Sequence, residues 1–377
     1  MFIIQLLDIL FFIISSITVL YLLFFSFAAF FKKNDAYHNT KARHRFAVLI
    51  PAYKDDDYII PTVRSVMRQD YPIDCYEIVV IADHLHPDTI LSLSQLPITL
   101  VQANFIKSSK TKALKAATSI LNENNYDIAV ILNADNLVDT DYLIKINDTF
   151  EAGSIAIQSH RVRQERSTNI SVIDAVADEI NNTITRLGHV ALGLSSSLNG
   201  SGMAFDYSWF NENINKLSDE EDEKALESLL LKDRIFIDYL DDANIYATKI
   251  GGKKKFYTQR RNWIHSHYSS FFGNIKNLPS AIVSGNLDYA DRIIQWGIFP
   301  RSIMFIITIF FSTILLFIEW SLSIKWFILF ILLLFSMALA TPDYLVDNKF
   351  NKSMKAIPLI GLSALINILF KKRNHYD

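Results

Sequence analysis

A polar turn directly after an apolar run is where this sequence first suggests metal chemistry. The run 130–132 leads into Asn133 and Asp135, as a buried parallel strand does when its end opens onto a ligand crevice. The Asp135 carboxylate and the Asn133 amide oxygen are ligands that a hard cation such as Mg²⁺ or Mn²⁺ prefers. A polar turn that caps the following helix has the same composition, so residues elsewhere must decide between the two interpretations.

Phosphate binding in this chain would depend on a metal and basic side chains. No Gly-x-x-x-x-Gly-Lys-Ser/Thr or Gly-x-Gly-x-x-Gly segment follows a predicted strand, so no glycine-rich phosphate loop is expected. Asp135 could hold the metal, and Lys110, Arg260 and Arg261 are the basic residues expected at the phosphates. The remaining lysines, including those at 253–255, are typical of a solvated surface.

The elements that must position these residues alternate between strands and helices. This alternation predicts an α/β fold with a doubly wound, mostly parallel sheet. Polar residues follow three of the strands, at 53–55, at Asp83 and at 133–135. Carboxyl ends of parallel strands share one edge, so these residues should meet there. The predicted strands are 46–50 (stopped by Pro51), 77–82, 98–102, 128–132 and 154–158, and the predicted helices are 58–69 and 111–121.

Composition excludes some classes of protein and indicates membrane segments at both ends. The chain has 377 residues and a formal net charge of −2, which argues against a general nucleic-acid binder. Cys75 is the one cysteine, so no intramolecular disulfide forms. The uncharged run 9–31 is too long for a cleaved signal peptide and predicts a retained transmembrane anchor. Basic residues from Lys32 onward place the next domain in the cytoplasm.

The C-terminal part predicts a transmembrane hairpin and an interfacial helix. Runs 302–318 and 326–342 lack charges, and Glu319 and Lys325 would flank the loop between them. The segment 356–370 is followed by basic residues that would lie outside if it spanned. We therefore expect it to lie in the cytoplasmic interface. Residues 267–301 mix apolar and basic side chains, which is typical of amphipathic helices at a membrane surface.

Several segments between 46 and 263 occur in an order that resembles the family 2 glycosyltransferases, which are membrane-anchored enzymes with the GT-A fold. In order they are Pro51-Ala-Tyr-Lys-Asp55, Ile81-Ala-Asp83-His84, Ser109-Lys110-Thr-Lys112-Ala-Leu114, Asn133-Ala-Asp135, Leu198-Asn-Gly200-Ser-Gly202-Met-Ala-Phe205, Glu221-Asp222-Glu223 and Gln259-Arg-Arg-Asn-Trp263.

The resemblance implies transfer of a sugar from a nucleoside-diphosphate sugar, with inversion at the anomeric carbon and a UDP-sugar as the favoured donor. It places Asp135 at the metal. The resemblance also implies two sets of binding residues, one for the donor and one for the acceptor or diphosphate. Donor-binding residues would be Pro51, Tyr53, Asp55, Asp83, Lys110, Asn133 and Asp135. Acceptor or diphosphate contacts would be Gly200, Gly202, Gln259, Arg260, Arg261 and Trp263.

The catalytic base can be assigned in two registers of the acidic run. Aligning the family's Glu-Asp pair with Glu221-Asp222 makes Asp222 the base, whereas aligning it with Asp222-Glu223 makes Glu223 the base. We expect Asp222, which matches the residue types literally. Acids at a helix start also favour the helix dipole without any catalytic role.

Two departures from the family pattern keep a non-catalytic function open. Asn133 replaces the first Asp of the Asp-x-Asp motif and removes one negative charge from the metal site. Asn262 replaces the Arg before Trp263.

These observations predict an inverting glycosyltransferase of surface polysaccharide assembly, with a membrane-proximal glycan or lipid-linked acceptor and possible partners in an assembly complex. The alternatives are a processive polysaccharide synthase, for which three spans are few, and a non-catalytic membrane partner that retains the fold. The predicted location is a bacterial-type inner membrane with the catalytic domain cytoplasmic. The expected domains are an anchor at 1–33, a GT-A domain at 34–265, interface helices at 266–300, a hairpin at 301–342 and a cytoplasmic tail at 343–377.

Overall fold

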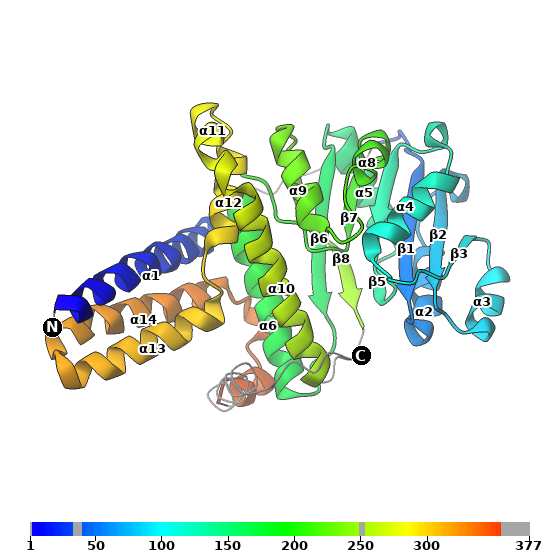
Figure 1. Ribbon diagram of the computed structural model, residues 1–377. Coiled ribbons are helices and arrows are strands. Elements are labelled where there is room, and N and C mark those ends of the chain that lie inside the picture. Colours follow the sequence, from blue (N-terminus) through cyan, green and yellow to red (C-terminus); the bar gives the residue numbers. More distant parts are fainter. Residues whose placement is uncertain (1, 33–39, 249–252, 356–377) are drawn as a thin grey trace.

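The protein has an α/β domain with an eight-stranded sheet, a bundle of three apolar helices, and a layer of helices between them (Figure 1). The computed structural model describes residues 2–32, 40–248 and 253–355. Side chains are described for residues 5–32, 40–248 and 261–355.

The sheet has the strand order β3-β2-β1-β4-β7-β6-β8-β5. Its first half is parallel, because β1 pairs in parallel with both β2 and β4, and β2 with β3. In the second half β6 and β8 are parallel, whereas β7 and β5 run antiparallel to their neighbours. The sheet is therefore mixed, more so than the sequence predicted. The strands are β1 (Phe46–Tyr53), β2 (Tyr76–Asp83), β3 (Thr99–Ala103), β4 (Ile128–Ile131), β5 (Asn136–Val138), β6 (Ala156–Arg163), β7 (Met203–Asp206) and β8 (Ile237–Ala247).

Pro51 does not end the first strand, contrary to the prediction. The pairing of β1 with β4 stops at Leu49 opposite Ile131, whereas the pairing with β2 continues to Tyr53 opposite Asp83. Proline lacks an N–H, and it is tolerated where one side of a strand has no partner. The three residues beyond the predicted strand end, 51–53, bring Tyr53 beside Asp83.

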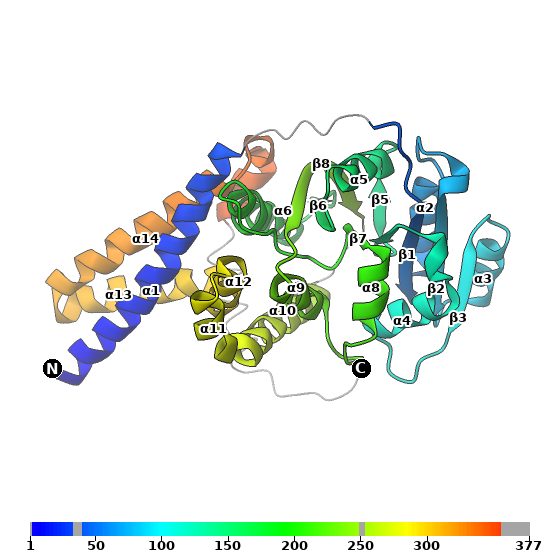
Figure 2. The same ribbon diagram turned by 90° about the horizontal axis from the view of Figure 1, so that it is seen from above.

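Helices cover both faces of the sheet (Figure 2). On one face, α2 and α5 contribute Ile59, Val63 and Ile146 to a buried core. On the other, α4, α8, α9 and α12 (Leu287–Gly297) form a second core that includes Trp296. The helices of this domain are α2 (Asp56–Val66), α3 (Pro87–Ser94), α4 (Lys110–Ile120), α5 (Tyr142–Glu151), α6 (Asn169–Asn182), α7 (Gly188–Val190), α8 (Tyr207–Ile214) and α9 (Glu223–Lys232).

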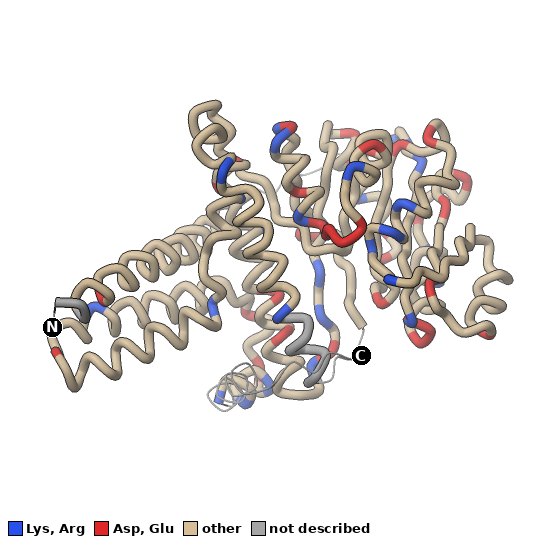
Figure 3. The backbone as a smooth tube through the Cα atoms, viewed as in Figure 1, with Lys and Arg blue, Asp and Glu red and all other residues tan. Residues whose placement is uncertain are grey.

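Three helices are long and apolar enough to cross a membrane, namely α1 (Phe2–Ala28), α13 (Arg301–Ile318) and α14 (Trp320–Ala340). They carry very few charges compared with the α/β domain (Figure 3). Helix α6, which the sequence analysis did not identify, packs Val172, Val176 and Ile180 into the core of this bundle. A Cβ at Gly188 would lie 2.1 Å from the carbonyl oxygen of Phe25, so a glycine is required where α1 crosses α7.

The hairpin between α13 and α14 is tighter than expected, since Glu319 alone separates the two helices. Lys325 lies inside α14 rather than in a loop, and its ammonium group pairs with the buried carboxylate of Asp8 on α1. The Trp326 indole N–H donates to the same carboxylate at 2.7 Å. Breaking a pair in so apolar a setting leaves a buried charge uncompensated, so Asp8 ties α1 to the hairpin.

The layer between bundle and sheet consists of α6, α10 (Lys253–Asn274), α11 (Leu278–Val283) and α12 (Leu287–Gly297) (Figure 1). Helix α10 is continuous across residue 265, where the sequence analysis placed a domain boundary. Phe272, Val283 and Leu287 are exposed, which suits a membrane surface. The predicted interfacial helix at 356–370 lies outside the described residues.

Candidate functional site

A cavity of about 490 Å³ lies between the carboxyl edge of the sheet and the membrane bundle. We call it the chamber. Its walls come from β6, α6, α10, the start of α9 and the loop before β7, and its far end is formed by residues of α1 and α13. Asn133, Asp222 and Glu223 line it at the sheet side, and Tyr21 and Arg301 at the bundle side. One hollow thus connects predicted site residues to the membrane helices.

The ends of β1 and β2 bring together several of the residues predicted to bind the donor. Register pairs Tyr53 with Asp83. The Asp83 carboxylate is 2.6 Å from Nδ1 of His84 and accepts from the Phe105 amide at 3.3 Å, so it is held in place. The exposed Tyr53 ring stands edge-on to His84 at 5.8 Å. Asp55 lies at the N-cap position of α2, two residues beyond this strand end.

Lys110 links the start of α4 to the polar turn after β4. Ser109 caps α4 by accepting from the Lys112 amide at 3.1 Å, which places Lys110 at the first helical position. Its ammonium donates to Oδ1 of Asn133 at 2.9 Å and to the carbonyl oxygen of Gly200. Burial lowers the pKa of Lys110 to about 8, although Glu223 and Asp135 act in the opposite direction. The Lys110 ammonium therefore lies against the polar turn after β4, and its role at the phosphates stays a prediction.

Asp135 is the residue that could share a cation with a substrate. Its backbone carbonyl accepts from the Thr248 amide at 3.0 Å, and its Oδ1 accepts from Asn136 Nδ2 at 3.2 Å. Within the described ranges, no group of three or more His, Cys, Asp or Glu side chains could hold a metal. Mg²⁺ needs only one or two carboxylates when substrate phosphates complete its shell. A single carboxylate at this edge fits a cation bound in that way.

The loop before β7 is shaped by two glycines with positive φ, Gly200 at +82° and Gly202 at +65°. A Cβ at Gly202 would lie 2.6 Å from the Ile245 side chain, and one at Gly200 would lie 3.1 Å from Oε2 of Glu223. The positive φ at both positions therefore favours glycine, and a Cβ would crowd the side chains of Ile245 and Glu223. The loop brings the Glu223 carboxylate against the residues that hold Lys110.

The three residues of the acidic run 221–223 make different contacts at the start of α9. Asp222 is the N-cap of α9, accepts from the Lys224 amide at 3.0 Å and from the Ser266 hydroxyl, and lies 3.7 Å from the Lys224 ammonium. Glu223 is the first helical residue, and its carboxylate lies beside Gly200. Glu221 points away, since its carboxylate accepts from the Ser218 amide. Both Asp222 and Glu223 line the chamber.

Helix α10 presents an aromatic pair to the chamber. Trp263 is partly exposed and stacks on His267, with ring centroids 4.7 Å apart and planes inclined by 20°. Burial, with the nearby Lys224 charge, lowers the pKa of His267 to about 4, so this ring is neutral near pH 7. Asn262 also lines the chamber, whereas Arg261 is exposed and does not. The side chains of Gln259 and Arg260 lie outside the described residues.

Several chamber residues escaped the sequence analysis. Arg161 and Arg163 lie two residues apart on β6 and therefore face the same side of the strand, toward the chamber. Asp174 and Asp178, one turn apart on α6, both pair with Arg163, at 3.0 and 2.6 Å. The spacing of Asp174 and Asp178, four residues apart, would put both on one face of a helix. No helix was predicted at 169–182, so the sequence analysis could not use this spacing.

The chain is similar to known proteins in sequence and in fold. Residues 44–213 match the family described as "Glycosyltransferase like family 2". No curated protein sequence matches the chain. Among solved structures, the chain is similar to the mannosyltransferase PcManGT from Pyrobaculum calidifontis in complex with GDP-Man and Mn²⁺, with 14% identity, coverage of 95% of this chain and 96% of that one, and a TM-score of 0.55.

A second solved structure is S. aureus TarS 1-349 in complex with UDP-GlcNAc, with 15% identity, coverage of 86% of this chain and 88% of that one, and a TM-score of 0.44. The similarity to PcManGT shows the fold, and the family match covers residues 44–213. This chain therefore carries a glycosyltransferase-2-like domain with a GT-A fold, together with three helices compatible with membrane anchoring.

Proposed function

We propose that the protein is an inverting, metal-dependent glycosyltransferase that moves a sugar from a nucleoside-diphosphate sugar to a membrane-proximal acceptor. The observation that carries this proposal is the chamber. It brings Lys110's partner Asn133 and the carboxylate of Glu223 into one hollow with residues of α1 and α13. An acceptor held by the membrane can thus meet a donor held by the sheet.

Donor binding in this proposal uses the carboxyl edge of the sheet. Tyr53 and Asp83 contact the base and ribose, Pro51 and Asp55 shape the same edge, and Lys110 contacts the diphosphate. Asp135 would hold Mg²⁺ or Mn²⁺, which would neutralise charge on the departing diphosphate. PcManGT was solved with GDP-Man and Mn²⁺, whereas the UDP-sugar preference stays a prediction.

For the base we propose Glu223. Asp222 is the residue favoured by the sequence, but its carboxylate already accepts hydrogen bonds from the Lys224 amide at the start of α9 and from the Ser266 hydroxyl. Glu223 faces the loop that also holds Lys110. Its carboxylate takes the proton of the acceptor hydroxyl while that oxygen forms a bond to the anomeric carbon. The bond from that carbon to the diphosphate oxygen breaks on the opposite side, which inverts the configuration.

The acceptor is a glycan or lipid-linked molecule of surface polysaccharide assembly, presented at the cytoplasmic face of a bacterial-type inner membrane. Trp263, stacked on His267, offers a flat face on which a sugar ring can pack. Gly200 and Gly202 let the loop approach closely. A processive synthase and a non-catalytic partner remain the alternatives.

Donor binding is tested first, with a panel of nucleoside-diphosphate sugars screened for thermal protection of the purified protein in the presence of Mn²⁺. Protection by none of them would contradict the proposal.

Lys110 gives donor binding a pH dependence. Its ammonium is charged below a pKa of about 8 and loses its charge as the pH rises through that value. Affinity for a nucleoside diphosphate should therefore be highest below pH 8 and fall above it. Calorimetric titrations from about pH 6.5 to about pH 9.5 measure this. Lys110→Arg, which stays charged throughout, should remove the fall, and an identical pH profile in both proteins would contradict the role of Lys110.

Membrane topology follows from the basic residues near the ends of α1 and α13. Reporter fusions after Lys355 and within 40–248 should report the cytoplasmic side. A fusion at Glu319, between α13 and α14, should report the opposite side and serves as the matched control. The same signal at Glu319 and Lys355 would show that α14 does not span.

A further inference from the structure

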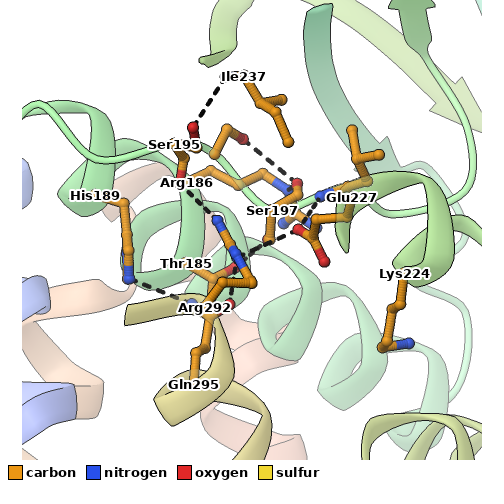
Figure 4. Close-up of polar contacts among 12 residues, drawn as sticks. Thr185, Arg186, His189, Ser195, Ser197, Lys224, Glu227, Ile237, Arg292 and Gln295 are labelled. Atoms are coloured by element: carbon orange, nitrogen blue, oxygen red, sulfur yellow. Dashed lines mark hydrogen bonds and ion pairs between the residues drawn. The ribbon is translucent and has the colours of Figure 1, made fainter. Parts of the chain in front are cut away.

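Arg292 on α12 is a completely enclosed arginine that joins its helix to α9 and to the loop before β7, with 0% of its surface exposed. Its Nη2 donates to the Ser195 carbonyl oxygen at 2.6 Å. Its Nη1 donates to Oε1 of Gln295 and lies 3.4 Å from Oε1 of Glu227 (Figure 4). Because the guanidinium is enclosed, any effect that it has on a reaction must pass through these partners.

Ser195 begins the loop before β7, and it is held at its amide, its hydroxyl and its carbonyl. Asp288, one turn before Arg292 on α12, accepts from the Ser195 amide at 2.8 Å and from its hydroxyl. The same hydroxyl oxygen accepts from the Ile237 amide of β8 at 3.0 Å. Two charged residues of α12 therefore fix the start of the loop that carries Gly200.

Helix α9 meets the same loop at two points, one helical turn apart. Glu227 accepts from the Leu198 amide at 3.0 Å, and the Glu223 carboxylate lies beside Gly200. Residues four apart share one face of a helix, so fixing Glu227 also fixes the direction of Glu223. Burial raises the pKa of Glu227, and the Arg292 charge acts in the opposite direction. Arg292 therefore favours the charged form of the carboxylate that ties α9 to the loop.

Arg292 is itself held from the side of the membrane bundle. Gln295, which accepts from its Nη1, has its Nε2 at 3.3 Å from Nε2 of His189 (Figure 4). The buried His189 ring stacks on Phe25 of α1, with centroids 3.7 Å apart and planes inclined by 8°. The contacts of Arg292 thus start from a helix that is anchored on α1.

We propose that Arg292 is a positioning residue for the transfer reaction, which holds the loop before β7 against α9 so that Gly200 and Glu223 stay side by side. The proposal rests on the proposed function, in which Glu223 is the base. The Gly200 carbonyl in turn accepts from Lys110, so the same hold keeps base and lysine together. A planar guanidinium suits this task because its N–H donors point in fixed directions, whereas a lysine ammonium is a point charge on a flexible stem.

Hydrogen exchange of the full chain in detergent, without any donor, tests the hold on the loop. In Arg292→Lys the amides of 195–198 should exchange at least about tenfold faster, because the loop loses the fork that bridges it to α9. The amides of β1 should not change. Unchanged exchange at 195–198 overturns the proposal, whether or not the protein turns over a donor.

Arg234→Lys is the matched control for the exchange experiment. Arg234 follows α9, is exposed, and donates to the Ser284 carbonyl at 2.7 Å, so it also links the end of α9 to the segment before α12. Its replacement should leave exchange at 195–198 and turnover as they are in the unmodified protein.

Turnover separates positioning from a merely structural role. Arg292→Lys should lower kcat by about tenfold or more and change the affinity for a nucleoside diphosphate by less than about threefold. The double variant that combines Arg292→Met with Glu227→Gln removes the whole buried ion pair, a change that is often nearly neutral for stability. Its thermal stability should exceed that of Arg292→Met alone, while its turnover per folded molecule should stay low.

Each outcome of these measurements decides the proposal. Turnover equal to that of the unmodified protein in the double variant, or in an Arg292→Lys protein with faster exchange, overturns it, because the arginine would then serve stability alone. Faster exchange in Arg292→Lys, together with no turnover by the unmodified protein, would contradict the proposed function while leaving the hold of Arg292 on the loop standing.

Discussion

Replacing Glu223 by glutamine should lower turnover of the nucleotide-sugar by about 10² or more while changing donor affinity only slightly. The amide keeps the size of the side chain beside Gly200 but cannot take the acceptor proton. Because the carboxylate also supports the charge of Lys110, a small loss of donor affinity is expected in addition. The measurement is the turnover number beside the dissociation constant of the nucleoside diphosphate.

Asp222→Asn is the matched control for this prediction. Asparagine caps helices about as well as aspartate, so α9 should start in the same place and turnover should fall only slightly. If Asp222→Asn is the severely impaired variant and Glu223→Gln is mild, the literal sequence register is right and Asp222 is the base. Full activity in both variants would remove the acidic run from catalysis.

Asp135→Ala should abolish the dependence of donor binding on Mn²⁺ or Mg²⁺ and weaken that binding by on the order of 10²-fold. The reason is that Asp135 offers a carboxylate at the carboxyl edge of the sheet, and within the described residues no other metal-binding group is assembled. Calorimetry of nucleoside diphosphate binding with and without the cation measures both effects.

Asn133→Asp is the complementary change at the same turn. It restores the charge that the family pattern has at this position, so metal-dependent binding should stay or strengthen. Lys110, which donates to Oδ1 of Asn133, can donate equally to a carboxylate. Unchanged nucleotide affinity in Asp135→Ala would contradict the metal assignment, whatever Asn133→Asp does.

The parallel half of the sheet was predictable because its strands are continuous apolar runs that end in polar residues. The strands at 76–83 and 128–131 lie within one residue of prediction. Strand β7 has only four residues after two glycines, too few for a periodic signal, and so the antiparallel pairings in the second half of the sheet were not predicted. Pro51 was wrongly predicted to end β1. The neighbouring strand β4 stops pairing with β1 at Leu49, so the N–H that proline lacks is not needed on that side.

The choice between Asp222 and Glu223 shows a similar limit. It depends on whether α9 begins one residue earlier or later, and sequence patterns place helix ends only to within one or two residues. The chamber lining around Arg186 depends on contacts between different segments of the chain. Arg186 meets the Ser197 carbonyl from a different segment of the chain, and no local pattern of residues indicates that its charge is enclosed.

Product formation by the purified, detergent-solubilised chain tests the central claim most directly. The protein is incubated with the nucleotide-sugar that protects it best, Mn²⁺ and membrane lipid extract, and both the released nucleoside diphosphate and the glycosylated lipid product are measured. The account predicts that both form in equal amounts, depend on the cation, and are lost together in Glu223→Gln. Donor binding without either product in the unmodified protein would contradict it and would favour a non-catalytic membrane partner that retains the fold.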